Sequence, residues 1–279
     1  MRQLSTARSM VLRRHLPVGG SRRDLGLLVG RPTAHGTQQP DGPRDSADGF
    51  DHGRSKPALS GTLPDTSAGW NPRPLGSRQG DTIPLPDDFS DRRMTVEEAI
   101  ERRRSVRAFH GPAVTLLQLS RLLHRASGIT DPATGFRAAP SAGALYPLEI
   151  YTVANSVQGL LQGIYRYRPS DHSLETVRRG DFRGRVSLAA LDQEVVARAS
   201  VVLVLAALFE RSRSKYGERS YRYVLMECGH VGENVYLAAT SMGLGACAVG
   251  AFMDDQINGL LGLGGRQEAA LYLLCLGSP

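Results

Sequence analysis

The chain has 279 residues, of which 41% are apolar and 22% charged, close to the averages of globular proteins. This composition excludes a collagen, a disulfide-rich scaffold and a wholly disordered chain. The longest unbroken apolar run, Val201 to Phe209, is too short to cross a bilayer, so no membrane partner is expected. The net charge of +7 is spread out, with 14 basic and 10 acidic side chains in residues 1–93, so no nucleic-acid partner is expected.

The three cysteines indicate a reducing compartment. Cys228, Cys247 and Cys275 are odd in number, and each has apolar neighbours. This pattern favours buried, reduced thiols over disulfides. We therefore expect a cytoplasmic protein without disulfide bonds.

Composition divides the chain into three parts. Residues 1–93 hold 10 of the 16 prolines and 12 of the 31 glycines and show no sustained apolar period. We expect a disordered Arg/Pro/Gly-rich segment over residues 1–48, an extended lead-in over 49–93 and a folded domain over 94–279. Residues 1–30 fit either an amphipathic leader or an overlong gene start.

The sequence of residues 94–279 predicts helices and strands that do not alternate strictly. Thr95 and Glu98 have the spacing of a capping box and predict a short helix, and leucines at helical spacing predict a second helix that Gly128 ends. Strands are expected at 148–153, 163–167 and 200–209, a long helix at 219–242, and strand, helix and strand at 245–252, 254–261 and 268–277. This order predicts an α+β domain in which helices surround a mainly antiparallel sheet.

Three short motifs partly match known functional patterns but do not support the corresponding functions. Gly243-x-Gly245 follows a helix and precedes a strand, the reverse of a dinucleotide-binding turn. The Ser-x-x-Lys pattern at 212–215 lacks its companion motifs. Cys228-x-His230 places its side chains on different faces of a helix, so no metal site is expected.

Two segments have residue types suited to a phosphate and to a flat ring. Arg103, Arg104, Ser105 and Arg107 offer guanidinium groups and a hydroxyl for a phosphate, or they complement the negative end of the preceding helix. The loop from Pro140 to Pro147 offers backbone donors and small side chains that would admit a flat ring. The alternative, which the residues alone favour, is an ordinary tight loop.

Taken in order, these segments resemble the nitroreductase superfamily, specifically the SagB-type dehydrogenases that act in thiazole- and oxazole-forming peptide biosynthesis. The resemblance covers about Phe50 to Pro279. The motifs that carry it are His52-x-x-Ser55-Lys56, Arg103 to Phe109, Pro140 to Glu149, Lys215-Tyr216-Gly217-x-Arg219-x-Tyr221-Arg222-Tyr223, Glu227 to His230, Gly243-Leu244-Gly245 with Gly250-Ala251-Phe252, and Leu271 to Gly277.

The resemblance implies an interlocked homodimer of nitroreductase-like fold with FMN at the subunit interface. Arg103, Ser105 and Arg107 would hold the phosphate, and the loop from Ser141 to Leu145 would pack against the flavin ring from the partner chain. The full set of implied cofactor-binding residues is Arg103, Arg104, Ser105, Arg107, Pro140, Ser141, Ala142, Gly143, Leu145, Ala248, Val249 and Gly250.

The resemblance also implies that Lys215 and Tyr216 are catalytic. The pair would take a proton from an azoline ring of a modified peptide while a hydride passes to FMN, which oxygen then reoxidises. A lysine is a base only where its surroundings favour the neutral amine, and Arg213, Arg219 and Arg222 are near enough in sequence to contribute. On residue type alone, a Lys-Tyr pair in an exposed loop before a helix is usually solvated.

The implied partners are the azoline-containing peptide and a cyclodehydratase complex. Two other functions fit the same sequence. One is an NAD(P)H-dependent nitro or quinone reductase of the same fold, against which the Lys-Tyr-Gly motif argues. The other is a non-catalytic scaffold subunit of a peptide-modifying complex.

Overall fold

The computed structural model describes residues 81–90 and 94–279, which belong to one compact unit, Asp65–Pro279. The predicted disordered segment 1–48, most of the lead-in 49–93 and the motif from His52 to Lys56 lie outside the described residues. Within the described ranges, no helix is both long and apolar enough to cross a membrane.

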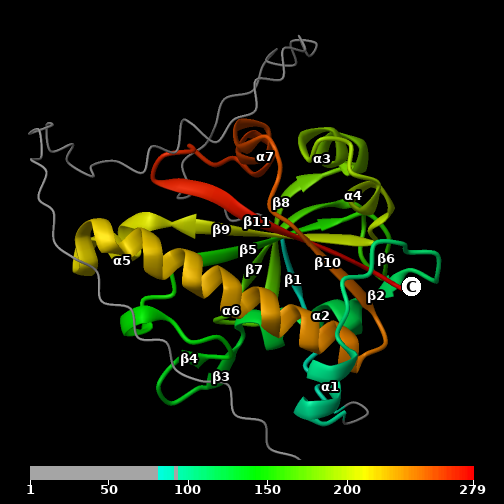
Figure 1. The fold of residues 1–279 in the computed structure, drawn as a ribbon, viewed down its shortest axis with the longest axis horizontal. Helices are drawn as coiled ribbons and strands as arrows, with labels where there is room; N and C mark the ends of the chain where they lie inside the picture. The colour runs from blue at the N-terminus through cyan, green and yellow to red at the C-terminus, as the bar shows by residue number, and fades with distance from the viewer. Residues whose placement is uncertain (1–80, 91–93) are drawn as a thin grey trace, which may run out of the picture. The chain divides into compact units, whose positions relative to one another are not determined.

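A seven-stranded sheet forms the centre of the domain, and every neighbouring pair of its strands is antiparallel. The strand order is β1-β8-β7-β5-β9-β11-β10 (Figure 1). The strands are β1 (Thr82–Pro84), β5 (Leu148–Ala154), β7 (Gly163–Arg168), β8 (Ser173–Arg179), β9 (Val201–Leu208), β10 (Gly245–Val249) and β11 (Glu268–Gly277). Two small sheets pair β2 (Val114–Thr115) with β6 (Val157–Gln158) and β3 (Ile129–Asp131) with β4 (Phe136–Arg137).

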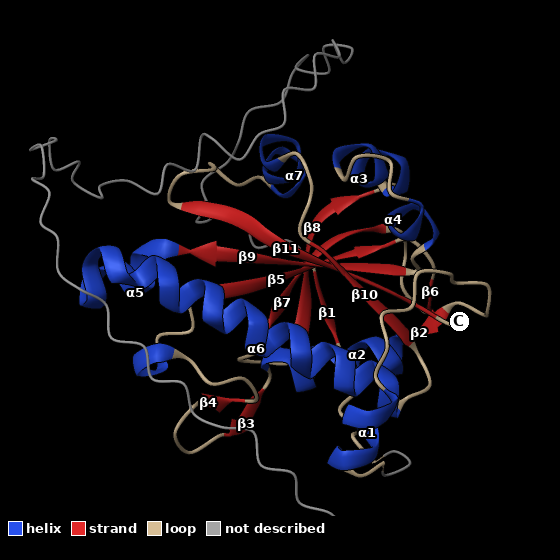
Figure 2. Ribbon diagram, in the orientation of Figure 1, coloured by secondary structure: helices blue, strands red, loops and turns tan. Residues whose placement is uncertain are grey.

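Helices cover both faces of the sheet, as Figure 2 shows. One face packs against α2 (Leu116–Ser127) and α6 (Ser220–Ser241), and the other packs against α3 (Arg183–Ala189), α4 (Glu194–Arg198) and α7 (Asp254–Leu261). Alternate residues of β9 supply the two cores: Leu203 and Leu205 face the first, and Val202 and Val204 face the second. This arrangement explains why β9 is apolar throughout.

The predicted α+β class and mainly antiparallel sheet are confirmed. The predicted strand over 245–252 is too long, because β10 ends at Val249. The helix α5 (Phe209–Tyr216) was not predicted, and Lys215 and Tyr216 lie in its last turn rather than in a loop. Only Ser212 of α5 is buried, so this helix has no apolar stripe by which it could be recognised.

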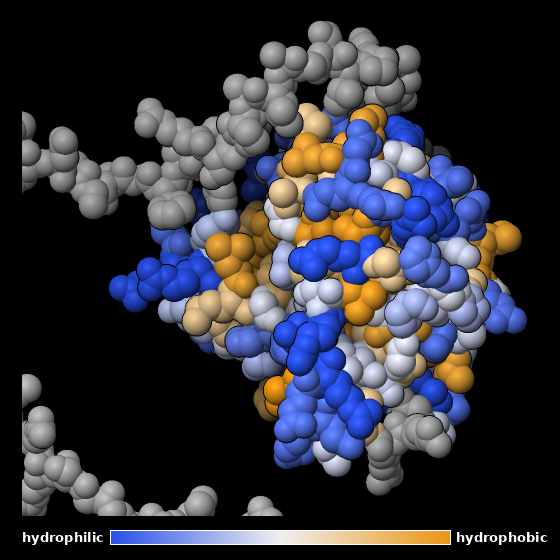
Figure 3. Space-filling view, turned by 45° about the vertical axis from the view of Figure 1, so that its right-hand side comes forward, coloured by the Kyte–Doolittle hydropathy of each residue, from blue (hydrophilic) through white to orange (hydrophobic). Residues whose placement is uncertain are grey.

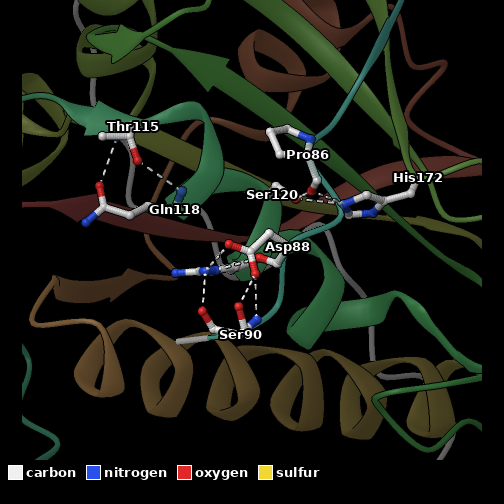
Figure 4. Close-up of polar contacts among 8 residues, drawn as sticks. Pro86, Asp88, Ser90, Thr115, Gln118, Ser120 and His172 are labelled. Atoms are coloured by element: carbon white, nitrogen blue, oxygen red, sulfur yellow. Dashed lines mark hydrogen bonds and ion pairs between the residues drawn. The ribbon is translucent and has the colours of Figure 1, made fainter. Parts of the chain in front are cut away.

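The start of the described chain is held against α2 (Figure 4). The Ser120 hydroxyl donates to the Pro86 carbonyl and lies 2.7 Å from Nε2 of His172. At the next residue of α2, the Arg121 guanidinium pairs with the Asp88 carboxylate at 3.1 Å. These contacts attach residues 86–88 to α2.

Candidate functional site

The arginine segment, Arg103 to Arg107, follows α1 (Val96–Arg102), whose predicted capping box is confirmed. Ser105 forms an isolated bridge with Ala246 of β10, and Arg103 and Ser105 both face Tyr236 of α6. Arg104 instead turns back, and its Nη1 donates to the carbonyls of Glu101 and Arg103 at 2.8 and 2.7 Å. Arg104 therefore has the helix-end role that was the alternative interpretation of this cluster.

The arginine segment lies along β10. The Val106 N–H donates to the Ala246 carbonyl at 2.8 Å. Glycine is required at two neighbouring strand positions, because a Cβ on Gly245 would lie 2.7 Å from Val106 Cγ1 and one on Gly277 would lie 2.8 Å from the Phe109 ring. This close approach places the arginines beside the strand that leads to Gly250.

Tyr236 of α6 joins the arginine segment to the end of β10. Its hydroxyl lies 3.1 Å from Ser105 Oγ and accepts the Ala248 N–H at 2.7 Å, while the Arg103 guanidinium lies 5.4 Å from the ring centroid. The predicted sites at 103–107 and 248–250 are thus brought together. The sequence analysis missed Tyr236, because nothing in its local pattern distinguishes it from a core aromatic residue.

The Ser141 loop, Pro140 to Pro147, has an unusual backbone. Gly143, Ala144 and Tyr146 have φ of 63°, 54° and 46°, and a left-handed conformation costs about 1–2 kcal/mol for each non-glycine residue. Hydrogen bonds hold it: the Tyr146 N–H donates to Ser141 Oγ at 2.9 Å, and Arg211 donates to the Tyr146 carbonyl at 3.0 Å. The loop is therefore tightly built, although its residue types had favoured an ordinary turn.

Lys215 and Tyr216 lie directly against the Ser141 loop of the same chain. A Cβ built on Gly143 would lie 2.6 Å from the Tyr216 hydroxyl and 2.8 Å from Lys215 Nζ. One turn earlier on α5, Arg211 forms a 2.7 Å ion pair with Glu149 of β5, which fixes the helix to the sheet. The two proposed catalytic groups thus meet at a glycine of the loop implied to contact the flavin.

A buried carboxyl group and a half-buried guanidinium group lie near the Ser141 loop. Glu227 of α6 is 5% exposed, and burial raises its pKa to about 7, although a hydrogen bond from Ser141 and the charge of Arg137 oppose the shift. Burial also lowers the pKa of Arg137, whose guanidinium lies 4.6 Å from the Tyr146 ring centroid. Glu227 was noted only as part of a motif and was not predicted as a site residue.

The Ser141 loop and the arginine segment lie beside different positions along α6. Glu227 lies near enough to Ser141 for that residue to influence its pKa, whereas the Tyr236 hydroxyl lies 3.1 Å from Ser105 Oγ in the arginine segment. Nine residues separate them, which corresponds to about 14 Å along the helix and to opposite sides of it. Figure 1 shows the same separation, with α5 and α1 at opposite ends of α6.

The arginine segment fits a phosphate by its chemistry. Arg103 and Arg107 form no ion pair with a carboxylate among the described residues, and the Ser105 hydroxyl shares the contact of Arg103 with Tyr236. Nothing lies within 4 Å of a Cβ built on Gly250, so space remains beside the end of β10. In the described part of the chain, no group of three or more His, Cys, Asp or Glu side chains could hold a metal ion.

The fold and these residues define an oxidoreductase of nitroreductase type. The chain belongs to the nitroreductase family, whose model matches residues 100–278. A protein of Methanocaldococcus jannaschii named as a nitroreductase is 44% identical over 200 residues, covering 71% of this chain and 98% of the relative. The solved structure of a nitroreductase homologue from Ralstonia eutropha has a TM-score of 0.62 at 28% identity and covers 75% of this chain and 95% of that one.

Other relatives process peptides. The microcin B17-processing protein McbC of Escherichia coli is 29% identical over 169 residues, 59% of this chain and 62% of McbC. The structure of the E. coli microcin synthetase McbBCD, with truncated pro-MccB17 bound, has a TM-score of 0.56 at 26% identity, covering 71% of this chain and 77% of that one. The resemblance to the peptide-processing branch of the superfamily is thus confirmed.

Proposed function

We propose that this protein is an FMN-dependent dehydrogenase that oxidises azoline rings of a ribosomally made peptide to azoles. The observation that carries the proposal is the contact of Lys215 Nζ and the Tyr216 hydroxyl with Gly143. It joins a proton-accepting pair to the loop implied to contact the flavin. The kinship to McbC and to the trifolitoxin-processing protein TfxB of Rhizobium leguminosarum bv. trifolii supports a peptide substrate.

FMN would be held by the residues that the fold groups together. Arg103, Ser105 and Arg107 would bind the phosphate, with the Ser105 hydroxyl oriented by Tyr236. The Ser141 loop and residues 248–250 would contact the ring. The chemistry that bound FMN supplies is acceptance of a hydride from the azoline, with the electrons passing on to oxygen.

Lys215 and Tyr216 would remove the proton that aromatisation also requires. Lys215 Nζ lies 5.4 Å from the Tyr216 ring centroid, and Tyr223 packs edge-on against that ring at 5.0 Å. Lys215 is exposed and Tyr216 half-buried, so a peptide can reach both groups. A proton leaving the azoline carbon would pass to one of these two atoms and then to water.

We also propose that the site is shared between two copies of the chain. The separation of the Ser141 loop from the arginine segment along α6 supports this arrangement. Figure 3 shows apolar patches among hydrophilic side chains on one face, and large apolar side chains are exposed on the helices that border the site. These are Val96 and Ile100 of α1 and Leu225 and Met226 of α6.

Mixing two inactive variants tests the shared site. Lys215→Ala chains are mixed and refolded with Arg103→Ala/Arg107→Ala chains and assayed at an FMN concentration that fills the wild-type site but not that of the arginine variant. Hybrid dimers should then contain one intact site, restoring about a quarter of all sites. Each variant alone should remain inactive. A monomer by light scattering, or no recovery in hybrids shown by mass spectrometry to have formed, would contradict a shared site.

The central test is direct oxidation of a peptide. The purified protein, reconstituted with FMN, is incubated aerobically with a synthetic thiazoline or oxazoline peptide, and mass spectrometry should detect loss of two hydrogens per ring. Rapid anaerobic bleaching of the flavin by NADPH, without azoline oxidation, would favour a nitro or quinone reductase. If the protein is colourless after incubation with excess FMN and removal of the unbound FMN, a scaffold subunit would be favoured.

We further propose that the chain acts in the cytoplasm beside a cyclodehydratase, which would generate the azoline. The McbBCD structure supports such an assembly, because a relative of this chain is solved there in a complex. Co-purification of the native chain with a cyclodehydratase would test this association.

A further inference from the structure

The Tyr236 hydroxyl has two hydrogen-bond partners, which come from segments far apart in the sequence. The Ala248 N–H of β10 donates to it at 2.7 Å, and Ser105 Oγ of the arginine segment lies 3.1 Å from it. Tyr236 is half-buried and lies near the C-terminal end of α6. The proposed flavin site uses only the contact with Ser105, so the bond from Ala248 has no role there yet.

The direction of both hydrogen bonds follows from the groups that make them. A backbone N–H can only donate, so the Tyr236 oxygen accepts the bond from Ala248. Among the described residues, Ser105 Oγ is the one acceptor within reach of the Tyr236 hydroxyl proton, so Tyr236 donates to Ser105. The Ser105 hydroxyl then directs its own proton away from Tyr236. The three groups form one chain, in which each bond is donated in the direction from Ala248 to Ser105.

The chain ends among positive charges. The Arg103 guanidinium carbon lies 5.4 Å from the centroid of the Tyr236 ring, so the same tyrosine contacts both Arg103 and Ser105. Within the described ranges, Arg103 and Arg107 form no ion pair with a carboxylate. A hydroxyl that donates outward beside guanidinium groups suits an anionic ligand.

We propose that Tyr236 is a positioning residue that couples the flavin phosphate, through Ser105, to the Ala248 amide of the ring-contacting residues 248–250. When Ser105 donates to a phosphate oxygen, its own oxygen becomes a better acceptor for the Tyr236 proton. The Tyr236 oxygen in turn becomes a better acceptor for the Ala248 N–H. The end of β10 is thereby held more tightly beside the flavin ring. This inference rests on the proposed function for the identity of the ligand, but the hydrogen-bond chain itself does not.

Two variants interrupt the chain at different points. Tyr236→Phe keeps the ring that contacts Arg103 but removes both hydrogen bonds of the hydroxyl, whereas Ser105→Ala removes only the end of the chain. Tyr236→Phe should fold, because the bond from the Val106 N–H to the Ala246 carbonyl at 2.8 Å joins the two segments without it. Ser105→Ala tests the same chain from its other end.

Tyr272→Phe is the matched control. Tyr272 of β11 packs against the same core as Tyr236, and its Cε1 would lie 3.3 Å from a Cβ on Gly232, one turn earlier on α6. In the described part of the chain, the Tyr272 hydroxyl forms no hydrogen bond. The control therefore removes a tyrosine hydroxyl near the same helix without interrupting the chain.

The first measurement is hydrogen exchange of the Ala248 amide in the full chain without flavin. In Tyr236→Phe, exchange should accelerate about five- to tenfold, the effect of losing one hydrogen bond. Ser105→Ala should stay closer to wild type, and Tyr272→Phe should leave this amide unchanged. Unchanged exchange in Tyr236→Phe, or equal acceleration in Tyr272→Phe, would overturn the hydrogen-bond chain.

The second measurement compares this exchange at saturating FMN and at saturating riboflavin, which has the same ring but no phosphate. In wild type, FMN should slow exchange of the Ala248 amide more than riboflavin does, because only FMN extends the chain at Ser105. The difference should disappear in Ser105→Ala and in Tyr236→Phe. Equal slowing by the two flavins in wild type, or a difference retained in both variants, would overturn the coupling.

The third measurement is the ratio of the riboflavin and FMN dissociation constants, from fluorescence titration of the apoprotein. This ratio should fall about tenfold in Ser105→Ala and in Tyr236→Phe and by no more in the double variant, because both residues act in one chain. A roughly hundredfold fall in the double variant, or an unchanged ratio in Tyr236→Phe, would overturn the coupling. If wild type binds neither flavin, the proposed function fails, while exchange of the Ala248 amide without flavin still decides the hydrogen-bond chain.

Discussion

The Ser141 loop and the arginine segment are built in opposite ways. The loop is held by a hydrogen bond within it and by hydrogen bonds from two other segments, the Arg137 N–H of β4 and the Arg211 guanidinium of α5. Its left-handed residues keep their conformation because these contacts fix it. The arginine segment is a short stretch without helix or strand. Within the described ranges, the Arg103 and Arg107 guanidinium groups form no ion pair with a carboxylate. A rigid surface suits the positioning of reacting groups, whereas unpaired cations suit the capture of an anion.

The largest expected effect comes from removing the groups that rest on the loop. Lys215→Ala and Tyr216→Phe should each lower kcat for azoline oxidation by about 10²- to 10⁴-fold, the usual contribution of a general base. Both variants should stay folded and yellow, because neither residue is needed to hold the phosphate. Steady-state kinetics and the flavin absorbance spectrum measure the two properties.

Ser214→Ala is the control for these variants, since Ser214 lies on the same helix, is exposed and donates to the Arg211 carbonyl of that helix at 3.3 Å. It should retain wild-type kinetics. Wild-type rates in both Lys215→Ala and Tyr216→Phe would contradict their catalytic assignment.

A smaller effect is expected from altering the loop itself. Gly143→Ala would place a Cβ within 3 Å of both Lys215 Nζ and the Tyr216 hydroxyl, at a residue with φ of 63°. Displacement of such groups by an ångström costs about 10²-fold in rate, so kcat should fall by that order with FMN still bound. Kinetics paired with a flavin titration measure this.

Gly184→Ala on α3 is the matched control, because nothing lies within 4 Å of its Cβ position. It should leave kcat unchanged and raise stability by up to about 1 kcal/mol. Equal kinetics for Gly143→Ala and Gly184→Ala would show that the loop does not position the pair.

Substitutions in the arginine segment should lower the affinity for FMN rather than kcat. Arg103→Ala and Arg107→Ala should each weaken FMN binding about tenfold or more, the value of a charge-assisted hydrogen bond to phosphate. Arg104→Ala should weaken it less, because Arg104 donates to carbonyls at the end of α1. Fluorescence titration of the apoprotein gives the three dissociation constants. Equal weakening of FMN binding in all three variants would show that Arg104 also belongs to the phosphate site, despite its hydrogen bonds to the end of α1.

The smallest effect should be on stability and should come from His124 and His172, which pack against Phe89 and Pro86. Burial lowers the pKa of both His124 and His172 from its ordinary value of 6.5. Because the unfolded chain binds these protons at higher pH than the folded chain does, stability is fully present above pH 6.5 and falls as the pH decreases through that value. Thermal unfolding at a series of pH values measures this, and His172→Gln should flatten the curve while FMN affinity stays unchanged. A steeper curve in His172→Gln would contradict the assignment.

Much of the fold was predictable, because it depends on local patterns. The capping box of Thr95 and Glu98, the apolar run of β9 and the long helix α6 each follow from residue spacing. The short helix α5 was missed, since its Ser- and Arg-rich sequence has no apolar stripe. It is held instead by the ion pair of Arg211 with Glu149.

The sequence by itself determined the α+β class, the cationic residues at 103–107 and the presence of a Lys-Tyr pair, because spacing and residue type express these properties directly. Only the tertiary structure decided that Arg104 turns back to α1, that Lys215 and Tyr216 meet Gly143, and that Tyr236 joins Ser105 to Ala248. Except for the local bonds of Arg104, these contacts join residues from 12 to 131 positions apart. Their formation depends on how α5, α6 and the sheet pack together, which no local pattern encodes.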